Sequence, residues 1–207
     1  MPNYKIYGKE SCVGLNSIID ENVIIGYPTE RILFGKNFNH IGAIIGNNAI
    51  IRSNSVIYTD VVIGNNFRSG HNVIIRENTT IGNNVLVGTN SIIDGKTTIG
   101  NNVSIQGNVY IPTNVIIEDD VFIGPSVVLT NDKYPIKKKE NLKGAIIRHD
   151  VSIGANSTIL PNIEIGEGSF IAAGALVTKN VPPWRLAIGF PAIIKDLPEE
   201  LRILNKI

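Results

Sequence analysis

The sequence is poor in cysteine, in net charge and in long apolar runs, and each shortage excludes a class of protein. A single cysteine, Cys12, excludes an internal disulfide and is typical of the reducing cytoplasm. The net charge of +1 gives no overall field that would attract nucleic acid or a membrane surface. No apolar run reaches the roughly 18 residues that span a bilayer, and the first residues contain no apolar signal segment. We therefore expect a cytoplasmic protein with neither nucleic acid nor membrane as a partner.

The chain is rich in aliphatic residues at every sixth position. From Ile45 to Leu129, fourteen of the fifteen positions in this register are aliphatic, and the register resumes from Ile147 to Val177. A period of six does not return to one face of a helix, but it fits short strands joined by Gly and Asn turns. Three such units form a coil of roughly 18 residues, and coils stack about 4.8 Å apart. The sequence therefore predicts an all-β fold, a parallel β-helix of hexapeptide repeats.

Two insertions and a tail interrupt this repeat. An earlier segment with Val13, Ile19 and Ile25 is out of phase, and residues 26–42 separate it from the main run. Residues 131–144 leave the phase unchanged, as expected of a loop that leaves the wall and returns in register. We expect a β-helix domain over residues 1–196. A short helix is expected over residues 197–207, because a proline and two glutamates are typical of a helix start.

Function is expected where the repeat fails, because the regular part accounts for stability. Ser69 is a polar residue in the inward register, and His71 follows it where an asparagine usually stands. Positions 18 apart lie above one another, and one such column contains Asn54, Asn72, Asn90 and Asn108. His71 and Asn108 would lie about 10 Å apart along the axis, so one bound sugar could touch both. The alternative for each asparagine is a structural ladder of side-chain amides.

Two blocks, VFIGPSVVLTNDKYP and IGANSTILPNIEIGEGSFIAAGALVTKNVPPWRLAIGFPAIIK, resemble the sugar-nucleotide N-acetyltransferases. In particular they resemble the enzymes that acetylate the 3-amino group of UDP-linked 2-acetamido-3-amino sugars. The N-terminal third of the chain matches only the general repeat. The resemblance implies a left-handed β-helix, acetyl-CoA as co-substrate with no metal requirement, and a homotrimer whose active sites lie between subunits.

The same resemblance implies where the coenzyme lies. The backbone near Ala155, Ala173 and Gly174 would face the pantetheine arm. The residues expected toward the nucleotide end of the coenzyme are Lys179, Gly189, Pro191 and Lys195. Small residues permit close approach and lysines complement phosphates, although corner packing and solvated charge remain the structural alternatives.

The loop lacks the histidine base that related xenobiotic acetyltransferases carry at this point. Its sequence here is Asn-Asp-Lys-Tyr-Pro, residues 131–135. A hydroxyl acceptor needs a base to become nucleophilic, whereas a neutral amine needs only positioning and the loss of a proton. The missing histidine therefore favours an amine acceptor. The resemblance implies that this acceptor is a UDP-2-acetamido-3-amino-2,3-dideoxy-hexose or its uronic acid.

Three residues are the catalytic candidates. The resemblance implies that Asn108 contacts the reacting amine. Asp132 would hold the amine or the sugar, or would only shape the loop as an Asx turn. His71 is the remaining base candidate, since imidazole titrates near neutrality, but it could also contact substrate while the proton leaves through the CoA sulfur. Further substrate contacts are expected from Asn131, Lys133, Tyr134, Asn72 and Asn90. The lysines at 137–139 would meet a diphosphate or remain solvated.

Other functions stay open beside this one. Within the enzymes, the alternatives are O-acetylation of a sugar and acetylation of a 4-amino group. A gamma-class carbonic anhydrase would use His40, His71 and His149, but these lie in unrelated columns and lack a His-x4-His spacing. A purely structural β-helix would need neither the loop nor the Gly189–Ala192 segment. The expected reaction is direct attack of the amine on the thioester, with backbone N–H groups stabilising the oxyanion.

Overall fold

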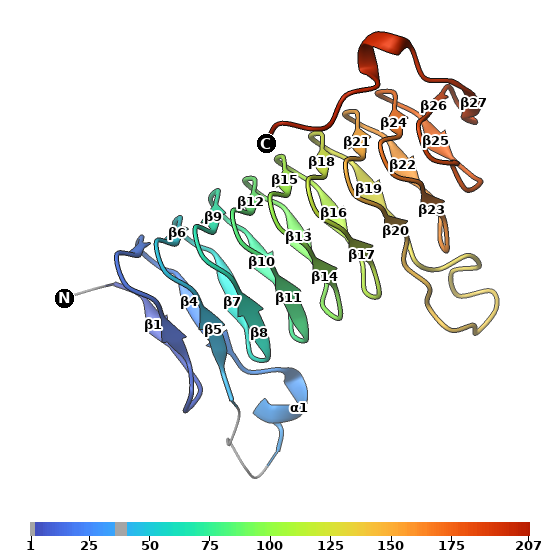
Figure 1. The fold of residues 1–207 in the computed structure, drawn as a ribbon. Helices are drawn as coiled ribbons and strands as arrows, with labels where there is room; N and C mark the ends of the chain where they lie inside the picture. The colour runs from blue at the N-terminus through green and yellow to red at the C-terminus, as the bar shows by residue number, and fades with distance from the viewer. Residues whose placement is uncertain (1–2, 36–40) are drawn as a thin grey trace.

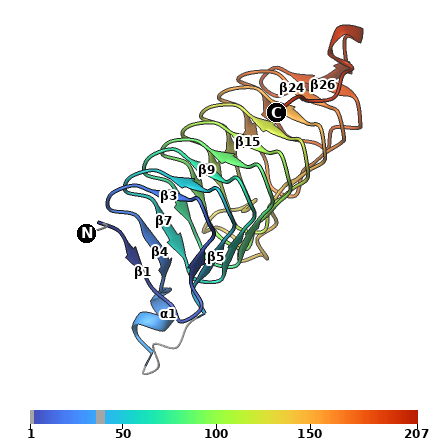
Figure 2. The same ribbon diagram turned by 60° about the vertical axis from the view of Figure 1, so that its left-hand side comes forward.

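The computed structural model describes residues 3–35 and 41–207. In these residues the chain winds into a three-sided, left-handed parallel β-helix, drawn in Figure 1 and from a second side in Figure 2. Each coil gives one short strand to each of three sheets, here called sheets A, B and C. The turns that join them form three edges, called A–B, B–C and C–A after the sheets that they connect. The predicted hexapeptide β-helix is confirmed.

All three sheets consist of short strands. Each strand pairs in parallel with the equivalent strand of the coil before and of the coil after, except for one antiparallel pair at the C-terminal end. Sheet A contains β1 (Lys5–Ile6), β4 (Ile24–Tyr27), β7 (Val56–Tyr58), β10 (Ile74–Ile75), β13 (Ile92–Ile93), β16 (Tyr110–Ile111), β19 (Val128–Leu129), β22 (Thr158–Ile159) and β25 (Leu176–Val177). Sheet B contains β2 (Cys12–Val13), β5 (Ala43–Ile45), β8 (Val61–Ile63), β11 (Thr79–Ile81), β14 (Thr98–Ile99), β17 (Ile116–Ile117), β20 (Ile146–Ile147) and β23 (Glu164–Ile165). Sheet C contains β3 (Ile18–Ile19), β6 (Ile50–Ile51), β9 (Arg68–Ser69), β12 (Leu86–Val87), β15 (Ser104–Ile105), β18 (Phe122–Ile123), β21 (Ser152–Ile153), β24 (Phe170–Ile171) and the antiparallel pair β26 (Arg185–Ile188) and β27 (Ile193–Asp196).

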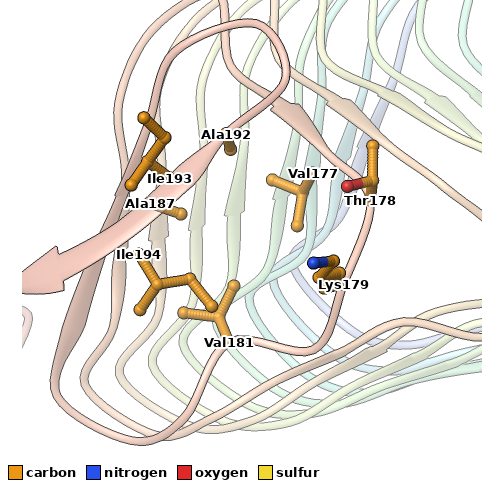
Figure 3. A pocket seen from close by; sticks show the side chains of 8 residues that line it. All are labelled: Val177, Thr178, Lys179, Val181, Ala187, Ala192, Ile193 and Ile194. Carbon is orange, nitrogen blue, oxygen red and sulfur yellow. The ribbon is translucent and has the colours of Figure 1, made fainter.

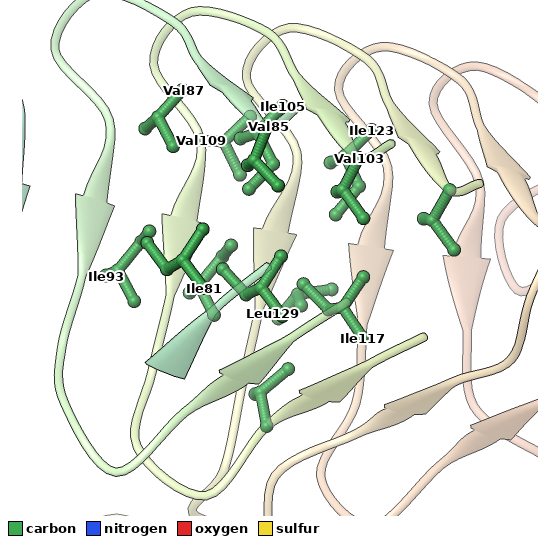
Figure 4. Close-up of a cluster of buried hydrophobic side chains, with 14 of the residues drawn as sticks. Ile81, Val85, Val87, Ile93, Val103, Ile105, Val109, Ile117, Ile123 and Leu129 are labelled. Carbon is green, nitrogen blue, oxygen red and sulfur yellow. The ribbon is translucent and has the colours of Figure 1, made fainter. Parts of the chain in front are cut away.

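The interior of the prism is a set of aliphatic columns. Ile75, Ile93 and Ile105 have no exposed surface, and Figure 4 shows such side chains stacked from coil to coil. Burying one aliphatic side chain of this size stabilises the fold by roughly 1.5–3 kcal/mol. The repeat of six is therefore the sequence signature of the core.

The break at Ser69 has a structural cause. Phe67 fills the interior in the same coil and is the largest fully buried side chain of the described residues. A small neighbour makes room for this ring, and the Ser69 hydroxyl accepts a hydrogen bond from the Arg52 N–H at 2.9 Å. The polar residue in the inward register thus serves packing.

The backbone conformation of the turns explains why asparagine is frequent at the corners. At most corners the second turn residue has a left-handed backbone, as at Asn66 (φ 59°) and Asn84 (φ 57°), and asparagine tolerates this conformation better than most residues. On the B–C edge these side chains form a ladder, in which Asn66 Nδ2 donates to Asn84 Oδ1 at 2.8 Å. The residue before each also helps, since Asn83 Oδ1 accepts the N–H of Asn65 at 2.8 Å. Side chains of the next coil therefore pair backbone donors that the strands leave unpaired.

Both insertions leave the prism at the A–B edge (Figure 1). The first separates β4 from β5 and contains α1 (Glu30–Leu33). The second separates β19 from β20, and residues 130–145 contain no strand. Across the first insertion stacked residues are 32 positions apart, and across the second they are 30 apart instead of 18. Only the second difference, twelve residues, is a multiple of six, which explains why only the first insertion shifts the repeat.

The C-terminal segment forms a strap along the prism. The prediction of a helix over residues 197–207 holds for one 3-10 turn, Glu199–Leu201, and is wrong for the rest. The reason is Asn205, whose Nδ2 donates to the carbonyl oxygens of Asp120 at 2.8 Å and Val151 at 3.2 Å, while its N–H donates to Asp150 at 3.0 Å. These contacts hold the segment extended against coils far back in the chain. In residues 3–35 and 41–207, no helical segment has the length and apolar character needed to cross a membrane.

Candidate functional site

The residues singled out by sequence lie on the two edges that border sheet A. The C–A edge carries His71, Asn72, Asn90, Asn108, Ala155, Ala173 and Gly174. The A–B edge carries Asn131, Asp132, Lys133, Tyr134 and Lys179. In a single chain the width of sheet A therefore separates the asparagine column from the extruded loop.

The asparagine column on the C–A edge is a ladder. Asn72 Nδ2 donates to Asn90 Oδ1 at 3.0 Å, and Asn90 Nδ2 donates to Asn108 Oδ1 at 3.3 Å. All three residues have left-handed backbones, so the structural alternative is observed for each. The ladder ends at Asn108, because Ser126 takes the equivalent corner in the next coil. In the part of the chain that the structure describes, the exposed Asn108 amide nitrogen has no partner and can donate to a ligand.

The backbone donors beside this ladder change along the edge. The N–H of His71 is paired by the Thr89 hydroxyl of the next coil at 3.2 Å. The column continues with Gly107, Pro125, Ala155 and Ala173, none of which has a side-chain oxygen. Within residues 3–35 and 41–207, the N–H groups of Gly107, Ala155 and Ala173 consequently have no acceptor. The B–C edge, with asparagine at the matching positions, shows the paired arrangement instead.

This row of free donors is open to solvent. A Cβ atom added at Gly174, where φ is +72°, would meet no atom within 4 Å. A ligand can therefore lie flat against this edge. The free N–H groups of Ala155 and Ala173 lie on successive coils, about 4.8 Å apart, which suits an extended ligand with carbonyl oxygens. Gly107 lies two coils below Ala155, because Pro125 between them has no N–H to donate.

His71 projects from the same edge. Its side chain is exposed, and among the described residues the imidazole has no hydrogen-bond partner. The ring is free to contact a ligand that lies over Asn72 and Asn90. The geometry leaves both roles available to it, base and substrate contact.

The extruded loop is held by its own polar groups. Asp132 Oδ1 accepts the N–H of Tyr134 at 2.9 Å, which is the Asx turn expected as the alternative for this residue. Asn131 Nδ2 donates to Thr113 Oγ1 at 2.9 Å, so this amide anchors the loop to the preceding coil. The ammonium of Lys133 lies 5.3 Å from the centre of the Tyr134 ring. The second oxygen of Asp132 remains available to a substrate.

A hollow of about 330 Å³ lies under the β26–β27 hairpin, at the C-terminal end of the prism (Figure 3). Lys179 lines it together with apolar residues that include Val177, Ala187 and Ile194. Gly189 and Pro191 form the hairpin turn nearby, and Lys195 on β27 pairs with Leu186 of β26. The structure thus brings Lys179 to the hairpin, while Lys195 does not line the hollow.

One group on the A–B edge was not expected from the sequence. Arg76 lies 5.4 Å from the Tyr58 ring centre and pairs with Glu77 at 2.9 Å and Asp94 at 3.2 Å. Burial, and then the Asp94 carboxylate, raise the pKa of Tyr110, whose hydroxyl lies 3.3 Å from Asp94. The positions 58, 76 and 94 are 18 apart, so the column rule could have found this polar stripe next to the insertion with α1.

A second group surrounds His149 on the B–C edge. Its Nδ1 lies 3.1 Å from Asp150 and its Nε2 lies 2.9 Å from Glu167. The hydrogen bond with Asp150, helped by the charge of Glu167, raises the pKa of His149. His71 and His149 lie on different edges of the chain, and His40 lies outside the described residues. Among residues 3–35 and 41–207, no group of three His, Cys, Asp or Glu could hold a metal ion.

Two family models match the chain. The model of the GMPPB C-terminal domain matches residues 33–141, and the model of the bacterial transferase hexapeptide (six repeats) matches residues 144–179. The first match spans more than half of the sequence. The chain therefore belongs to the GMPPB C-terminal domain family, and its later coils carry the hexapeptide repeat of bacterial transferases.

Individual relatives are similar over shorter stretches. A serine acetyltransferase of Buchnera aphidicola subsp. Schizaphis graminum (strain Sg) is 51% identical over 53 residues, which are 25% of this chain and 20% of that protein. A 2,3,4,5-tetrahydropyridine-2,6-dicarboxylate N-acetyltransferase of Staphylococcus aureus (strain JH9) is 47% identical over 55 residues, 26% of this chain and 23% of the other. The matches span about a fifth of the length of these relatives.

A solved structure is similar over nearly the whole chain. LpxA, a UDP-N-acetylglucosamine acyltransferase from Bacteroides fragilis, superposes with a TM-score of 0.75 over 94% of this chain and 73% of its own, at 22% identity. At this identity the similarity concerns the fold. It agrees with the left-handed β-helix described above.

The His149 group yields a pH prediction. A raised folded-state pKa means that protonated His149 stabilises the native state below its ordinary pKa of about 6.5, and that this contribution is lost as pH rises through the higher folded value. We expect the NMR titration of His149 to have its midpoint above about 6.5 and the Glu167→Gln variant to titrate at lower pH. A wild-type midpoint at or below 6.5, or no change in the variant, would contradict the assignment.

Proposed function

We propose that the chain is an acetyl-CoA-dependent N-acetyltransferase acting on the amino group of a nucleotide-linked amino sugar. The expected acceptor is a UDP-2-acetamido-3-amino-2,3-dideoxy-hexose or its uronic acid. The observation that carries the proposal is the row of unpaired N–H groups on the C–A edge. The local similarity to named acetyltransferases, near 50% identity over a quarter of the chain, supports it.

The pantetheine arm of the coenzyme fits this row. It is an extended chain with two amide groups, and its carbonyl oxygens can accept from the N–H groups of Ala155 and Ala173. The open surface at Gly174 leaves room for the arm. In this arrangement the nucleotide end of the coenzyme lies toward the hairpin, near Lys179, Gly189, Pro191 and Lys195.

The reaction proposed for the lower end of the row is direct acyl transfer. The amine nitrogen forms a bond to the thioester carbon, the carbon–sulfur bond breaks, and CoA leaves. The N–H of Gly107 would donate to the oxyanion, and the free amide of Asn108 would orient the amine. The proton lost by the amine passes to His71 or to the leaving sulfur. The second oxygen of Asp132 would hold the amine or the sugar.

A homotrimer would unite the two edges. The outward column of sheet A is mostly apolar and includes Ile24, Val56, Ile74, Ile92, Tyr110, Val128 and Leu176. Packing this face around a three-fold axis buries it and sets the A–B edge of one subunit beside the C–A edge of the next. Each site would then combine the loop of one chain with Asn108 of another.

The second candidate is O-acetylation, because the exposed and unpaired His71 imidazole could activate a hydroxyl group. The choice of acceptor separates the two candidates. With acetyl-CoA, the purified protein should turn over a UDP-linked 3-amino sugar faster than the matched 4-amino sugar, and the matched hydroxyl analogue should not react. CoA release measures the rate, and product mass identifies the acetylated position. Reaction of the hydroxyl analogue alone would overturn the amine proposal.

The next prediction tests the donor row. Thr at position 173 should pair the Ala155 N–H as Thr89 pairs that of His71, and thereby remove a donor from the coenzyme. Ala173→Thr should weaken acetyl-CoA binding about tenfold, the worth of roughly one hydrogen bond, without lowering Tm. The matched control is Asn47→Thr at the equivalent B–C corner, which should bind normally. If calorimetry gives the two variants equal affinities for acetyl-CoA, the row of free N–H groups is not part of the coenzyme site.

Another prediction tests the shared site. Asn108→Gly keeps the left-handed backbone and Asp132→Asn keeps the Asx turn, so each alone should lose activity but fold normally. Co-expression of the two should restore about a quarter of native activity, because in a closed trimer that share of sites receives both intact edges. No recovery, with mixed trimers verified by native mass spectrometry, would argue against a site between subunits.

A further inference from the structure

The extruded loop borders an open hollow of about 800 Å³ on the A–B edge. One wall is the outgoing arm with Asp132 and Lys133, and the other is the returning arm with Lys139 and Lys143. The turn of the following coil, with Pro161 and Asn162, closes one side. Three lysines from both arms of the loop thus line a single space.

The structure divides the lysines of the loop into two groups. Lys133, Lys139 and Lys143 line the hollow, and within the described residues none of them forms an ion pair. Lys138 does not line it, and its ammonium is paired with Glu140. The ammonium groups of Lys133 and Lys138 lie 5.3 Å and 5.6 Å from the Tyr134 ring centre, so what distinguishes Lys133 is the absence of an ion pair. Lys137 is also absent from the lining.

The negative charges around the hollow are partly compensated. Glu140 lines it but is already paired with Lys138. Asp132 lines it with one oxygen engaged by the Tyr134 N–H. Three unpaired ammonium groups against these two carboxylates leave the space with an excess of positive charge.

The base of the loop is fixed by one hydrogen bond between its two arms and by hydrogen bonds to the preceding and the following coil. The Lys143 N–H donates to the Asn131 carbonyl at 2.9 Å, and the Lys143 carbonyl accepts the Asn162 N–H at 3.0 Å. Asn114 Nδ2 donates to the Leu142 carbonyl at 3.0 Å. The base of the loop is therefore held in place before a ligand arrives, which lowers the conformational entropy lost on binding.

We propose that this hollow binds the diphosphate of a nucleotide. Lysine is a compact point charge that complements phosphate oxygens, and several such charges around one space give a salt-dependent anion site. The inference rests on the proposed function for its source of nucleotide. Two ligands of that reaction carry a diphosphate, the sugar nucleotide and the coenzyme. Because the nucleotide end of the coenzyme is proposed to lie at the hairpin, the sugar nucleotide is the expected occupant, and the test distinguishes the two.

The experiment measures binding by calorimetry at low and at physiological salt, with UDP, uridine and CoA as probes. The triple variant Lys133→Ala/Lys139→Ala/Lys143→Ala should bind the diphosphate probe, UDP, at least tenfold more weakly than the wild type. The affinity of this variant should also depend less on salt concentration. Lys139→Ala alone should weaken it about threefold. The matched control is Lys137→Ala, two positions away in the same lysine run, which should bind as the wild type does.

Each outcome decides one question. Loss of UDP binding alone assigns the hollow to the sugar nucleotide, and loss of CoA binding alone assigns it to the coenzyme. Unchanged affinity for both in the triple variant, with an unchanged Tm, overturns the proposal, as does a wild type that binds uridine as tightly as UDP and does not bind CoA. Binding needs no turnover, so a protein that holds UDP through these lysines but transfers no acetyl group would overturn the proposed function and keep this inference.

Discussion

The pairing of backbone N–H groups from one coil to the next is the constraint on which the rest of this structure depends. The strands pair their own donors, but the corners rely on side chains of the adjacent coil, such as Asn83 for Asn65. Where the corner residue has no side-chain oxygen, as at Ala155 and Ala173, the donors stay free. The same rule that stabilises the B–C edge therefore leaves unpaired donors on the C–A edge beside sheet A, with no change in the path of the chain.

The three edges differ in how their backbone donors are paired and in whether they carry insertions. The B–C edge is closed by its asparagine ladder and by the strap at Asn205, and the C–A edge is open in its C-terminal half. Both insertions leave at the third edge, A–B. Within one chain the loop and the open donors therefore lie on opposite borders of sheet A, whose outward face is mostly apolar, and this separation is why the proposed function includes a homotrimer.

Much of the fold could be predicted, because an aliphatic residue at every sixth position permits few other structures. The ladder at Asn72 and Asn90 and the Asx turn at Asp132 also follow from stacking and local hydrogen bonding. The placement of Asn108 and Asp132 on different edges can be found by counting strands as well as coils, because each hexapeptide moves the chain to the next edge. The strap escaped prediction since Asn205 bonds to residues 55 and 85 positions earlier, which no local pattern reports. The unpaired N–H groups could have been predicted from the sequence, because the part of the column with Gly107, Ala155 and Ala173 contains no side-chain oxygen.

The two insertions show that the chain can be longer at a corner while the core keeps its register. Cys12 and Val13 pair with Ile44 and Ile45 across the first insertion, and Ile116 and Ile117 pair with Ile146 and Ile147 across the second. The stacking therefore does not depend on the number of inserted residues, which changes only the spacing of the repeat in the sequence. An A–B corner of this solenoid is consequently a position where new segments can be accommodated with the interior unchanged.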